Sequence, residues 1–252
     1  MPVDINFMFS GEAGQGVQAV GHVLSRALAR GGFHVFADQD YESRIRGGHS
    51  FFRVRVSDAD VRALSDTVDI LIAFNKESVD VHRTELSAKG IIVFDSGKVK
   101  DKGNGSNLFA VPFERLAQES AKNKLMTNTV ALGAALGLAG YDLQILRDTL
   151  TDYFGTGDAG KANVSAVTAG YEYARTNFKG DFNHRINPIS NIKRMLLSGN
   201  EAIALGALAA GCKFMAAYPM TPATSIMEYL ASKTKDFDIA VVQPEDEISA
   251  IN

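Results

Sequence analysis

Near its amino terminus the chain reads Val3-Asp-Ile-Asn-Phe-Met-Phe-Ser-Gly-Glu-Ala-Gly-Gln-Gly16, a largely apolar run that ends in a glycine-rich turn. The apolar run predicts a short buried strand. Apolar residues then recur at helical spacing from Val17 to Leu28, and Gly31 with Gly32 ends this helix. His34 to Ala37 predicts a second strand, so this part of the chain has the pattern of a βαβ unit.

Strand and helix patterns continue to alternate further along the chain. Ser50 to Val56 alternates apolar and charged side chains, which predicts a half-buried strand near a sheet edge. Asp69 to Phe74 and Ile91 to Phe94 are continuous apolar runs, typical of buried parallel strands, and a helix is expected near Ser78 to Ala88. Asn107 to Val111 predicts one more strand.

The segment from Phe113 to Phe178 is helical in pattern, and its glycines and small residues at Ala131 to Gly140 indicate close helix packing. Strands that alternate with helices and lead into a helical tail are typical of a three-layer α/β domain. We therefore expect a three-layer, Rossmann-like α/β domain over residues 1–180.

A second, incomplete α/β domain is expected over residues 196–252, after a polar linker at residues 181–195. A Gly-rich helix from Gly199 to Gly211 leads into a short strand that ends at Tyr218-Pro-Met-Thr-Pro222, and a second strand runs into Gln243-Pro-Glu-Asp-Glu247. Domains below roughly 60 residues are marginally stable. This part should therefore lean on the first domain, on a partner, or on residues that the sequence does not contain.

Composition and charge narrow the class of protein. The formal net charge is −3, which gives no reason to expect a nucleic acid as partner. The single cysteine, Cys212, excludes a disulfide framework and a four-thiolate iron–sulfur cluster built within this chain. No apolar run approaches the length of a membrane span, and the amino terminus lacks the pattern of an export signal. A soluble cytoplasmic protein with no membrane partner is the expectation.

Gly11, Gly14 and Gly16 lie between the first strand and the first helix, where free backbone N–H groups and the helix dipole favour an anion. The nicotinamide fingerprint would require a glycine at Ala13, although Asp38 stands where its ribose-binding acid would be. Three interpretations therefore stay open: a nicotinamide nucleotide, the anionic group of another ligand or contact with a partner domain, and a tight turn without a ligand.

A second loop, Ser43-Arg-Ile-Arg-Gly-Gly-His-Ser50, places two guanidinium groups and an imidazole beside a flexible glycine pair. Arg44 and Arg46 together fit a phosphate or a carboxylate. A solvated turn that leads into the next strand explains the same residues equally well. The sequence does not show whether this loop faces the glycine loop.

Tyr218-Pro-Met-Thr-Pro222 is a more specific motif. Pro219 and Pro222 fix φ on either side of Thr221, and Pro222 restrains Thr221 to extended geometry. A hydroxyl held in this way after a buried strand is suited to donate a hydrogen bond to a bound carboxylate or cofactor. Thr221 is equally suited to cap a helix over Ala223 to Lys233, and the two roles are compatible.

Glu245, Asp246 and Glu247 follow the last expected strand. They are either acids of a first helical turn, or they include one carboxylate that points inward with a raised pKa, suited to proton exchange with a cofactor ring. No metal site is expected, because no histidine or further carboxylate lies at ligand spacing. Gly157-Asp158 and Gly180-Asp181 superficially match a magnesium–diphosphate motif, but no buried strand precedes them, so they predict loops.

Together these motifs resemble one family. The GEAGQGV and SRIRGGHS segments resemble the gamma domain of 2-oxoacid:ferredoxin oxidoreductases. Three later segments resemble the start of their alpha subunit, a thiamine-diphosphate pyrimidine-binding α/β domain: GNEAIALGALAAG from Gly199, YPMTP from Tyr218 and QPEDE from Gln243. The order of gamma before alpha is similar to the fused subunit of the 2-oxoglutarate-type enzymes. Ala13 departs from the family, because a glycine is usual there.

The resemblance implies a component of an enzyme. The family decarboxylates a 2-oxoacid, such as 2-oxoglutarate, on thiamine diphosphate, passes electrons through iron–sulfur clusters to ferredoxin, and forms an acyl-CoA. It also implies a beta subunit that carries the diphosphate and Mg²⁺ site and the iron–sulfur cluster, within a hetero-oligomer. The chain alone is expected to be inactive.

The resemblance also implies roles for individual residues. Thr221 would contact the substrate carboxylate or the cofactor, with Tyr218 and Pro219 in the same cofactor-binding loop. A glutamate of the QPEDE segment would hydrogen-bond the aminopyrimidine ring and activate the thiazolium, with Glu247 preferred and Glu245 as second choice. The coenzyme A phosphates would be contacted by the two amino-terminal loops, at Gly11, Gly14, Gly16, Arg44 and Arg46.

Two other interpretations remain. The chain could be a nucleotide-binding Rossmann-like module whose tail docks to another protein, or a non-catalytic assembly subunit. Saturable binding of NAD(H) or FAD that Asp38→Ala abolishes would favour the nucleotide-binding module. Co-purification with a partner that carries iron–sulfur absorbance would favour the enzyme component.

Overall fold

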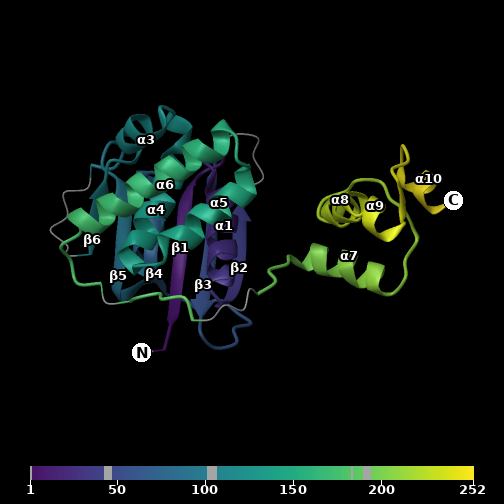
Figure 1. Ribbon diagram of the computed structural model, residues 1–252, viewed down its shortest axis with the longest axis horizontal. Helices are drawn as coiled ribbons and strands as arrows, with labels where there is room; N and C mark the ends of the chain where they lie inside the picture. The colour runs from purple at the N-terminus through teal and green to yellow at the C-terminus, as the bar shows by residue number, and fades with distance from the viewer. Residues whose placement is uncertain (1, 43–46, 101–106, 183, 190–193) are drawn as a thin grey trace. The chain divides into compact units, whose positions relative to one another are not determined.

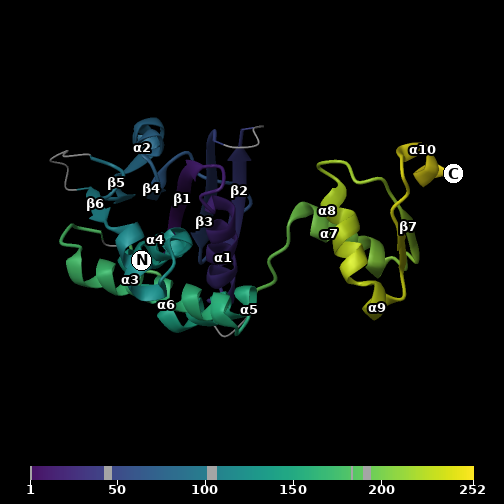
Figure 2. The same cartoon turned by 90° about the horizontal axis from the view of Figure 1, so that it is seen from above.

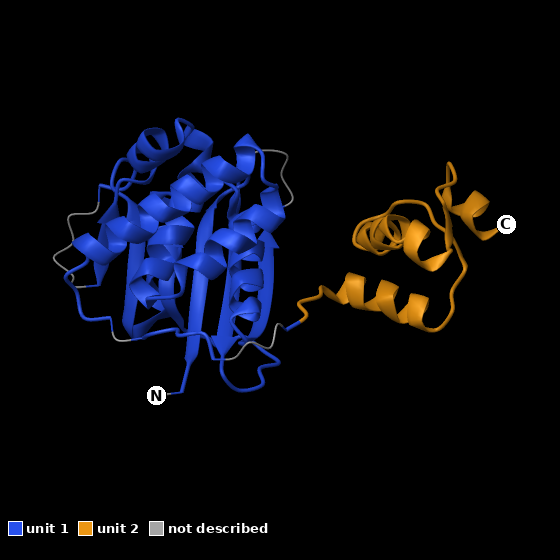
Figure 3. Cartoon of the chain, viewed as in Figure 1, with its two compact units in different colours: residues 1–194 blue, residues 195–252 orange. Residues whose placement is uncertain are grey.

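The computed structural model describes residues 2–42, 47–100, 107–182, 184–189 and 194–252. The chain divides into two compact units, residues 1–194 (unit 1) and residues 195–252 (unit 2), shown in blue and orange in Figure 3. Each unit combines helices with a β-sheet. The α/β fold class expected from the sequence is therefore confirmed.

Unit 1 contains, within the described residues, a six-stranded mixed sheet in the order β2-β3-β1-β4-β5-β6. β1, β4, β5 and β6 run parallel to one another, whereas β3 is antiparallel to both of its neighbours, β1 and β2. The strands are β1 (Asp4–Glu12), β2 (His34–Tyr41), β3 (His49–Ser57), β4 (Val68–Ala73), β5 (Leu86–Asp95) and β6 (Leu108–Val111).

The position of β3 corrects the predicted βαβ start. β1, helix α1 (Val17–Arg30) and β2 follow one another in the chain, but β3 lies between the two strands and pairs with both. β3 lies next to the edge strand β2, so its predicted place near a sheet edge is correct. β3 alternates because Phe52 and Val54 are buried, whereas Arg53 on the opposite face pairs with Asp38 on β2.

Helices cover the two faces of this sheet unequally, as Figures 1 and 2 show. One face packs against α1 and the later helices of unit 1, and this side holds the larger core, which includes Phe7, Leu24 and Val130. The other face packs against α2 with a smaller core around Met8 and Val79. β4 is buried on both faces, which explains its continuous apolar sequence. The helices are α2 (Lys76–His82), η1 (Arg83–Glu85), α3 (Phe113–Ala121), η2 (Lys124–Met126), α4 (Thr127–Ala139), α5 (Leu143–Phe154) and α6 (Asp158–Asn177).

α4 and α6 pack closely through glycines, which confirms the expectation from Ala131 to Gly140. A Cβ atom on Gly133 would collide with the carbonyl oxygen of Val167, and one on Gly170 would collide with the carbonyl oxygen of Val130. α4 is buried on nearly all sides because α6 and the sheet enclose it, so its sequence is apolar all round. None of the described helices is long and apolar enough to cross a membrane.

The predicted helix near Ser78 to Ala88 is too long at its carboxyl end. α2 ends at His82, and after η1 the chain enters β5 at Leu86. Val68 pairs with Leu86, but the next pair joins Ile70 to Ile91, so the ladder is irregular there. The intervening polar residues and Gly90 mask the strand in the sequence.

The described part of the predicted linker 181–195 packs against unit 1. Phe182 and Ile186 are buried in the larger core, and the Ile186 N–H donates to the carbonyl of Ala139 at 2.9 Å. The Ile189 N–H donates to the carbonyl of Gly31 at 3.0 Å. This segment lacks periodicity because single side chains, and not a helix or strand face, fix it to the unit.

Unit 2 holds few buried apolar side chains. In the described part of this unit, β7 and β8 pair in a two-stranded parallel sheet. The core cluster consists of Ala204, Leu208, Leu230 and Ile239. So small a core fits the marginal stability expected from the sequence. The elements are α7 (Gly199–Ala209), β7 (Phe214–Ala216), α8 (Thr224–Ser232), α9 (Thr234–Phe237), β8 (Ala240–Val242) and α10 (Glu247–Ile251).

Helix α7 forms where the sequence predicts it. Ser198 caps it, and Ser198 and Glu201 form a reciprocal capping box. Its glycines do not pack closely within unit 2, because a Cβ atom on Gly199 or Gly206 would meet nothing within 4 Å. Ile203 on the same helix is 60% exposed. This helix therefore presents an open face of small and apolar residues.

Candidate functional site

The glycine loop joins β1 to α1 at the carboxyl end of the strand. Gly14 and Gly16 have φ values of 95° and 76°, a left-handed backbone that favours glycine. α1 begins at Val17 with no acidic residue in its first turn. Its amino terminus can therefore receive an anion without repulsion from its own side chains.

Two amide side chains shape this loop. Gln15 Oε1 accepts a hydrogen bond from the Glu12 N–H at 2.8 Å, which closes the turn internally. Asn128, at the start of α4, donates to the carbonyl of Gly16 at 3.4 Å, and a Cβ atom on Gly16 would collide with this side chain. The glycine at position 16 is thus required both by its backbone conformation and by the close approach of α4.

The glycine loop and the arginine loop are in contact. The Ala13 N–H donates to the carbonyl of Gly48 at 3.3 Å, and the Ser50 hydroxyl donates to the carbonyl of Gly11 at 3.1 Å. The contact follows from the sheet, because the end of β1 pairs with the start of β3. Arg44 and Arg46 lie outside the described residues, and Gly47 and Gly48 follow them with φ values of 70° and 82°. The two loops that the sequence predicts as anion contacts therefore adjoin each other.

A hydrogen-bonded imidazole chain lies directly behind this loop contact. His49 Nε2 is 2.7 Å from His82 Nε2, and His82 Nδ1 is 2.6 Å from Glu85 Oε1. The Ser10 hydroxyl lies 3.3 Å from His49 Nε2 and donates to the Ser78 hydroxyl at 3.0 Å. This hydrogen-bonded imidazole chain could not be predicted from the sequence, because its members come from β1, β3, α2 and η1 and no spacing rule connects them.

Burial lowers the pKa of His49 below the ordinary value of 6.5, and the neighbouring His82 lowers it further. Three carboxylates oppose these effects and raise the pKa: Glu77, Glu42 and Asp40. The net direction is downward, so His49 is neutral at pH 7.

Acidification is therefore expected to destabilise unit 1 through His49. The folded-state pKa lies below the unfolded value, so the unfolded chain takes up the proton more readily. The stability that neutral His49 supplies is present above about pH 6.5 and is lost as the pH falls below it. Urea unfolding at pH 7.5 and 5.5 should show a smaller acid loss in His49→Gln than in the wild-type chain. Equal losses would contradict this assignment.

Asp38 does not occupy a ribose-binding position. Its carboxylate accepts two hydrogen bonds from Arg53, at 3.2 Å from Nε and 3.1 Å from Nη2. β3 separates β2, which carries Asp38, from β1 and the glycine loop. The dinucleotide site of a Rossmann fold needs these two strands side by side, so the geometry disfavours the nicotinamide interpretation.

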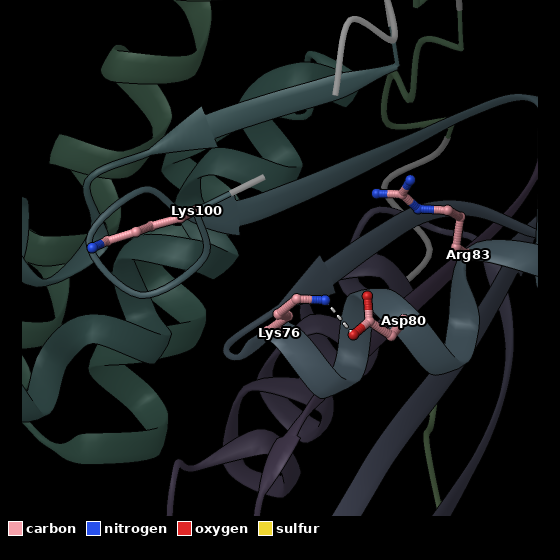
Figure 4. Close-up of a pocket in the computed structure, with 4 residues that line it drawn as sticks. All are labelled: Lys76, Asp80, Arg83 and Lys100. Carbon is pink, nitrogen blue, oxygen red and sulfur yellow. Dashed lines mark hydrogen bonds and ion pairs between the residues drawn. The ribbon is translucent and has the colours of Figure 1, made fainter. Parts of the chain in front are cut away.

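A basic pocket of about 330 Å³ lies beside α2 (Figure 4). Lys76, Asp80 and Arg83 come from α2 and η1, and Lys100 comes from the segment after β5. Lys76 forms an ion pair with Asp80, one turn further along the helix. This pocket could not be predicted from the sequence, because its basic side chains are separated along the chain and follow no motif.

The threonine loop follows β7 in unit 2. Thr221 is exposed and precedes Pro222 across a cis peptide bond. α8 begins at Thr224, so the alternative role of Thr221 as helix cap is wrong. The Asn200 side chain on α7 donates to the carbonyl of Pro222 at 2.7 Å and to the hydroxyl of Ser225 at 2.6 Å, and so ties the loop to two helices. Tyr218 and Pro219 lie in the same loop.

The acidic turn follows β8. Asp246 caps α10 and accepts a hydrogen bond from the Ser249 N–H at 2.7 Å, which lowers the pKa of its carboxyl group. Glu245 and Glu247 are both exposed in unit 2. The expected inward-pointing carboxylate is therefore not found within this unit, because the turn has no covering layer there.

The threonine loop and the acidic turn leave the same edge of the sheet. β7 and β8 are parallel, and the Ala217 N–H donates to the carbonyl of Val242 at 3.1 Å just before both turns begin. Thr221 and Glu247 thus belong to neighbouring turns at the carboxyl end of the two strands. Such an edge is where open α/β sheets bind ligands.

No cluster of three or more histidine, cysteine or acidic side chains with metal-binding geometry occurs among the described residues. Asp158 is the first residue of α6, and Gly157 caps that helix. The loops of unit 1 suit an anion, because the amino terminus of α1 begins there without an acidic residue in its first turn.

Two models of one class of proteins, the pyruvate ferredoxin/flavodoxin oxidoreductases, match this chain. The family model described as "Pyruvate ferredoxin/flavodoxin oxidoreductase" matches residues 6–173. A second model, "Pyruvate flavodoxin/ferredoxin oxidoreductase, thiamine diP-bdg", matches residues 205–252. The chain belongs to the pyruvate ferredoxin/flavodoxin oxidoreductase family, and the resemblance drawn from its motifs is confirmed.

Curated relatives agree with this assignment. The 2-oxoacid:ferredoxin oxidoreductase subunit alpha of Sulfolobus sp is 26% identical over 98% of this chain and 47% of the relative. Ketoisovalerate oxidoreductase subunit VorA of Methanothermobacter thermautotrophicus is 32% identical over 71% of this chain and 38% of the relative. The chain thus spans less than half the length of these curated relatives.

Two solved structures are similar. The 2-oxoglutarate:ferredoxin oxidoreductase from Magnetococcus marinus, solved with 2-oxoglutarate, coenzyme A and succinyl-CoA bound, has a TM-score of 0.85 and 30% identity, covering 98% of this chain and 44% of that one. The gamma subunit of a keto/oxoacid ferredoxin oxidoreductase from Geobacter sulfurreducens has a TM-score of 0.61 and 25% identity, covering 70% of this chain and 99% of that one.

Proposed function

We propose that the chain is a component of a 2-oxoacid:ferredoxin oxidoreductase, which oxidatively decarboxylates a 2-oxoacid to an acyl-CoA and passes the electrons to ferredoxin. The observation that supports this most directly is that consecutive parts of one chain, residues 6–173 and 205–252, match two parts of the same family. Unit 1 (residues 1–194) then corresponds to the gamma domain, and unit 2 (residues 195–252) to the start of the pyrimidine-binding domain.

Unit 1 is proposed to contact the phosphates of coenzyme A through the glycine and arginine loops. Gly14 and Gly16 turn the backbone at the amino terminus of α1, and the hydrogen bond from Ala13 to Gly48 brings the second loop alongside. Arg44 and Arg46, in that second loop, would add guanidinium donors. The structure from Magnetococcus marinus contains coenzyme A, which makes this ligand the first to test.

Arg44→Ala and Arg46→Ala are each expected to raise the Kd of the complete complex for coenzyme A by about tenfold or more. A hydrogen bond to a charged group contributes about 1.5–3 kcal/mol, and 1.4 kcal/mol is a factor of ten. Isothermal titration calorimetry measures the change. Arg62→Ala is the matched control, because Arg62 pairs with Asp60 on an exposed surface.

Pantetheine provides a second arm for this test. It lacks the nucleotide phosphates, so its affinity should not change in the Arg44 and Arg46 variants if these arginines recognise phosphate. An unchanged Kd for coenzyme A in both variants would contradict the proposed contact. A parallel loss for pantetheine would instead indicate a general disruption of the loop.

Unit 2 is proposed to supply one wall of a thiamine diphosphate site. When bound, this cofactor supplies the nucleophilic carbon that attacks the 2-oxoacid carbonyl. Thr221 would donate a hydrogen bond to the substrate carboxylate or the cofactor, with Tyr218 and Pro219 shaping the same loop. Glu247, with Glu245 as second choice, would hold and exchange a proton at the aminopyrimidine ring. The common sheet edge of the two turns supports this arrangement.

The proposed complex needs a beta subunit. The diphosphate and Mg²⁺ site and the iron–sulfur cluster are proposed to lie in that partner, as the resemblance to the family implies. Expression of the chain with the neighbouring open reading frame should yield a hetero-oligomer whose elution peak carries iron–sulfur absorbance. Purification of the chain without such a partner from its native source would contradict the proposal.

2-Oxoglutarate is the proposed substrate, because the similar structure from Magnetococcus marinus contains 2-oxoglutarate and succinyl-CoA. Turnover assays of the complex with 2-oxoglutarate, pyruvate and a branched 2-oxoacid would rank the candidates. We propose a cytoplasmic location, where ferredoxin and coenzyme A are available. The nucleotide-binding alternative gains no support from Asp38, which pairs with Arg53.

A further inference from the structure

The chain from Glu85 through His82 to His49 has one consistent direction of hydrogen bonding. An ionised carboxylate only accepts hydrogen bonds, so His82 donates its Nδ1–H to Glu85 at 2.6 Å. Neutral His82 is left with a lone pair on Nε2. When both imidazoles are neutral, the proton in the 2.7 Å contact between the two Nε2 atoms belongs to His49.

The neighbouring hydroxyl groups agree with this direction. Ser78 donates to Asn75 Oδ1 at 2.8 Å, and Ser10 donates to the Ser78 hydroxyl at 3.0 Å. Ser10 is then able to accept from His49 Nε2 at 3.3 Å, so the same proton is shared between His82 and Ser10. The other neutral tautomer of His49 would leave two lone pairs facing each other.

His49 lies at the junction of the two loops. Its neighbour Gly48 accepts a hydrogen bond from the Ala13 N–H at 3.3 Å, and its other neighbour, Ser50, donates to the carbonyl of Gly11 at 3.1 Å. The His49 ring also packs against His82, with 4.9 Å between centroids, and against Phe51 at 6.5 Å. The His49 ring is therefore held at the residue that lies between these two hydrogen bonds.

We propose that Glu85 and His82 are positioning residues that hold His49 in its neutral Nε2–H form, and that this form keeps the two loops joined between Gly48 and Ala13. The proposal concerns the shape of the candidate anion site and does not depend on which anion binds there.

Both basic and acidic side chains surround the pair of His49 and His82. His82 and Glu77 face His49 from α2, Glu85 acts through His82, and Asp40 and Glu42 lie at the end of β2. In the part of the chain that the structure describes, His49 Nδ1 is buried without a hydrogen-bond partner.

The test is a long-range ¹H–¹⁵N spectrum of the full chain labelled with ¹⁵N-histidine, recorded at pH 7.5. The expected result is protonation of His49 on Nε2 alone and of His82 on Nδ1 alone. In Glu85→Gln the amide can donate or accept, so His82 is expected to populate both tautomers. Hydrogen exchange of the Ala13 amide is expected to accelerate about tenfold, the upper range for the loss of one hydrogen bond.

Glu77→Gln is the matched control, because it removes a nearby negative charge from α2 without removing the acceptor of the imidazole chain. It should leave both tautomers and the Ala13 exchange close to wild type. Protonation of His49 on Nδ1 in the wild-type chain would overturn the proposal, even if Glu85→Gln failed to fold. Wild-type tautomers and Ala13 exchange in a folded Glu85→Gln chain would overturn it as well.

Discussion

Glu247→Gln in the complete complex is expected to lower 2-oxoacid turnover by about 10²–10⁴-fold, the contribution of a general acid–base group. Glutamine keeps the size of the side chain but cannot hold and exchange a proton at the aminopyrimidine ring. Glu247 is the first residue of α10, and its exposure within unit 2 means that the substitution breaks no buried contact there. Assembly of the complex and its thiamine diphosphate content should remain close to wild type.

The measurement combines steady-state turnover with size-exclusion chromatography and cofactor analysis. Glu245→Gln is the matched control, because it removes the same charge two residues earlier in the same turn. Its turnover should stay within a few-fold of wild type. Near-normal turnover in Glu247→Gln would end the proposed role, and loss only in Glu245→Gln would transfer the role to Glu245.

Gly133→Ala is expected to destabilise unit 1 by about 2–3 kcal/mol, the usual cost of overpacking a tight core. The new methyl group would collide with the carbonyl oxygen of Val167, and backbone at this contact cannot rotate away as a side chain could. α4 and α6 would have to separate, although their contact supports the whole helical layer over the sheet. Thermal unfolding should show a Tm about 4–12 °C lower.

The same substitution in another helix gives the control. A Cβ atom on Gly206 in α7 would meet nothing within 4 Å, so Gly206→Ala should stabilise the helix by up to about 1 kcal/mol. Hydrogen exchange can assign each effect to its unit. An unchanged Tm in Gly133→Ala would show that the two helices do not pack as closely as described.

The regular elements of unit 1 were largely predictable from local pattern. Continuous apolar runs predicted β4 and the buried part of β5, and period and small residues predicted α1 and the close packing of α4. These features follow from burial on one or two faces, which the sequence records directly. The insertion of β3 between β1 and β2 was not predictable in this way, because pairing partners leave no local signal.

The candidate site was predictable only in part. The motifs placed a glycine loop, a threonine loop and an acidic turn where the structure has them, and parallel pairing of β7 with β8 brings the last two to one edge. The hydrogen-bonded imidazole chain from Glu85 to His49 was not predicted, because its histidines lie 33 positions apart in the sequence. The roles of Thr221 and Glu247 stay predictions, and Arg44 and Arg46 lie outside the described residues.

The segment after α6, the predicted linker 181–195, shows a different limit of prediction from sequence. A polar, proline-containing sequence predicts a linker, yet Phe182 and Ile186 are buried in unit 1. Two apolar side chains without a period are too weak a signal to separate a docked segment from a free one. Only the packing of these side chains in the larger core, with the Ile186 N–H donating to the carbonyl of Ala139, distinguishes the two cases.

The antiparallel strand within the sheet constrains the order of assembly during synthesis. A nascent chain that has emerged only as far as Tyr41 contains β1, α1 and β2, but its two strands have no common hydrogen-bonding partner. Pairing across this edge requires β3, because this strand supplies the ladders to both β1 and β2. The same strand joins β1 to β2 and sets Gly48 beside Ala13.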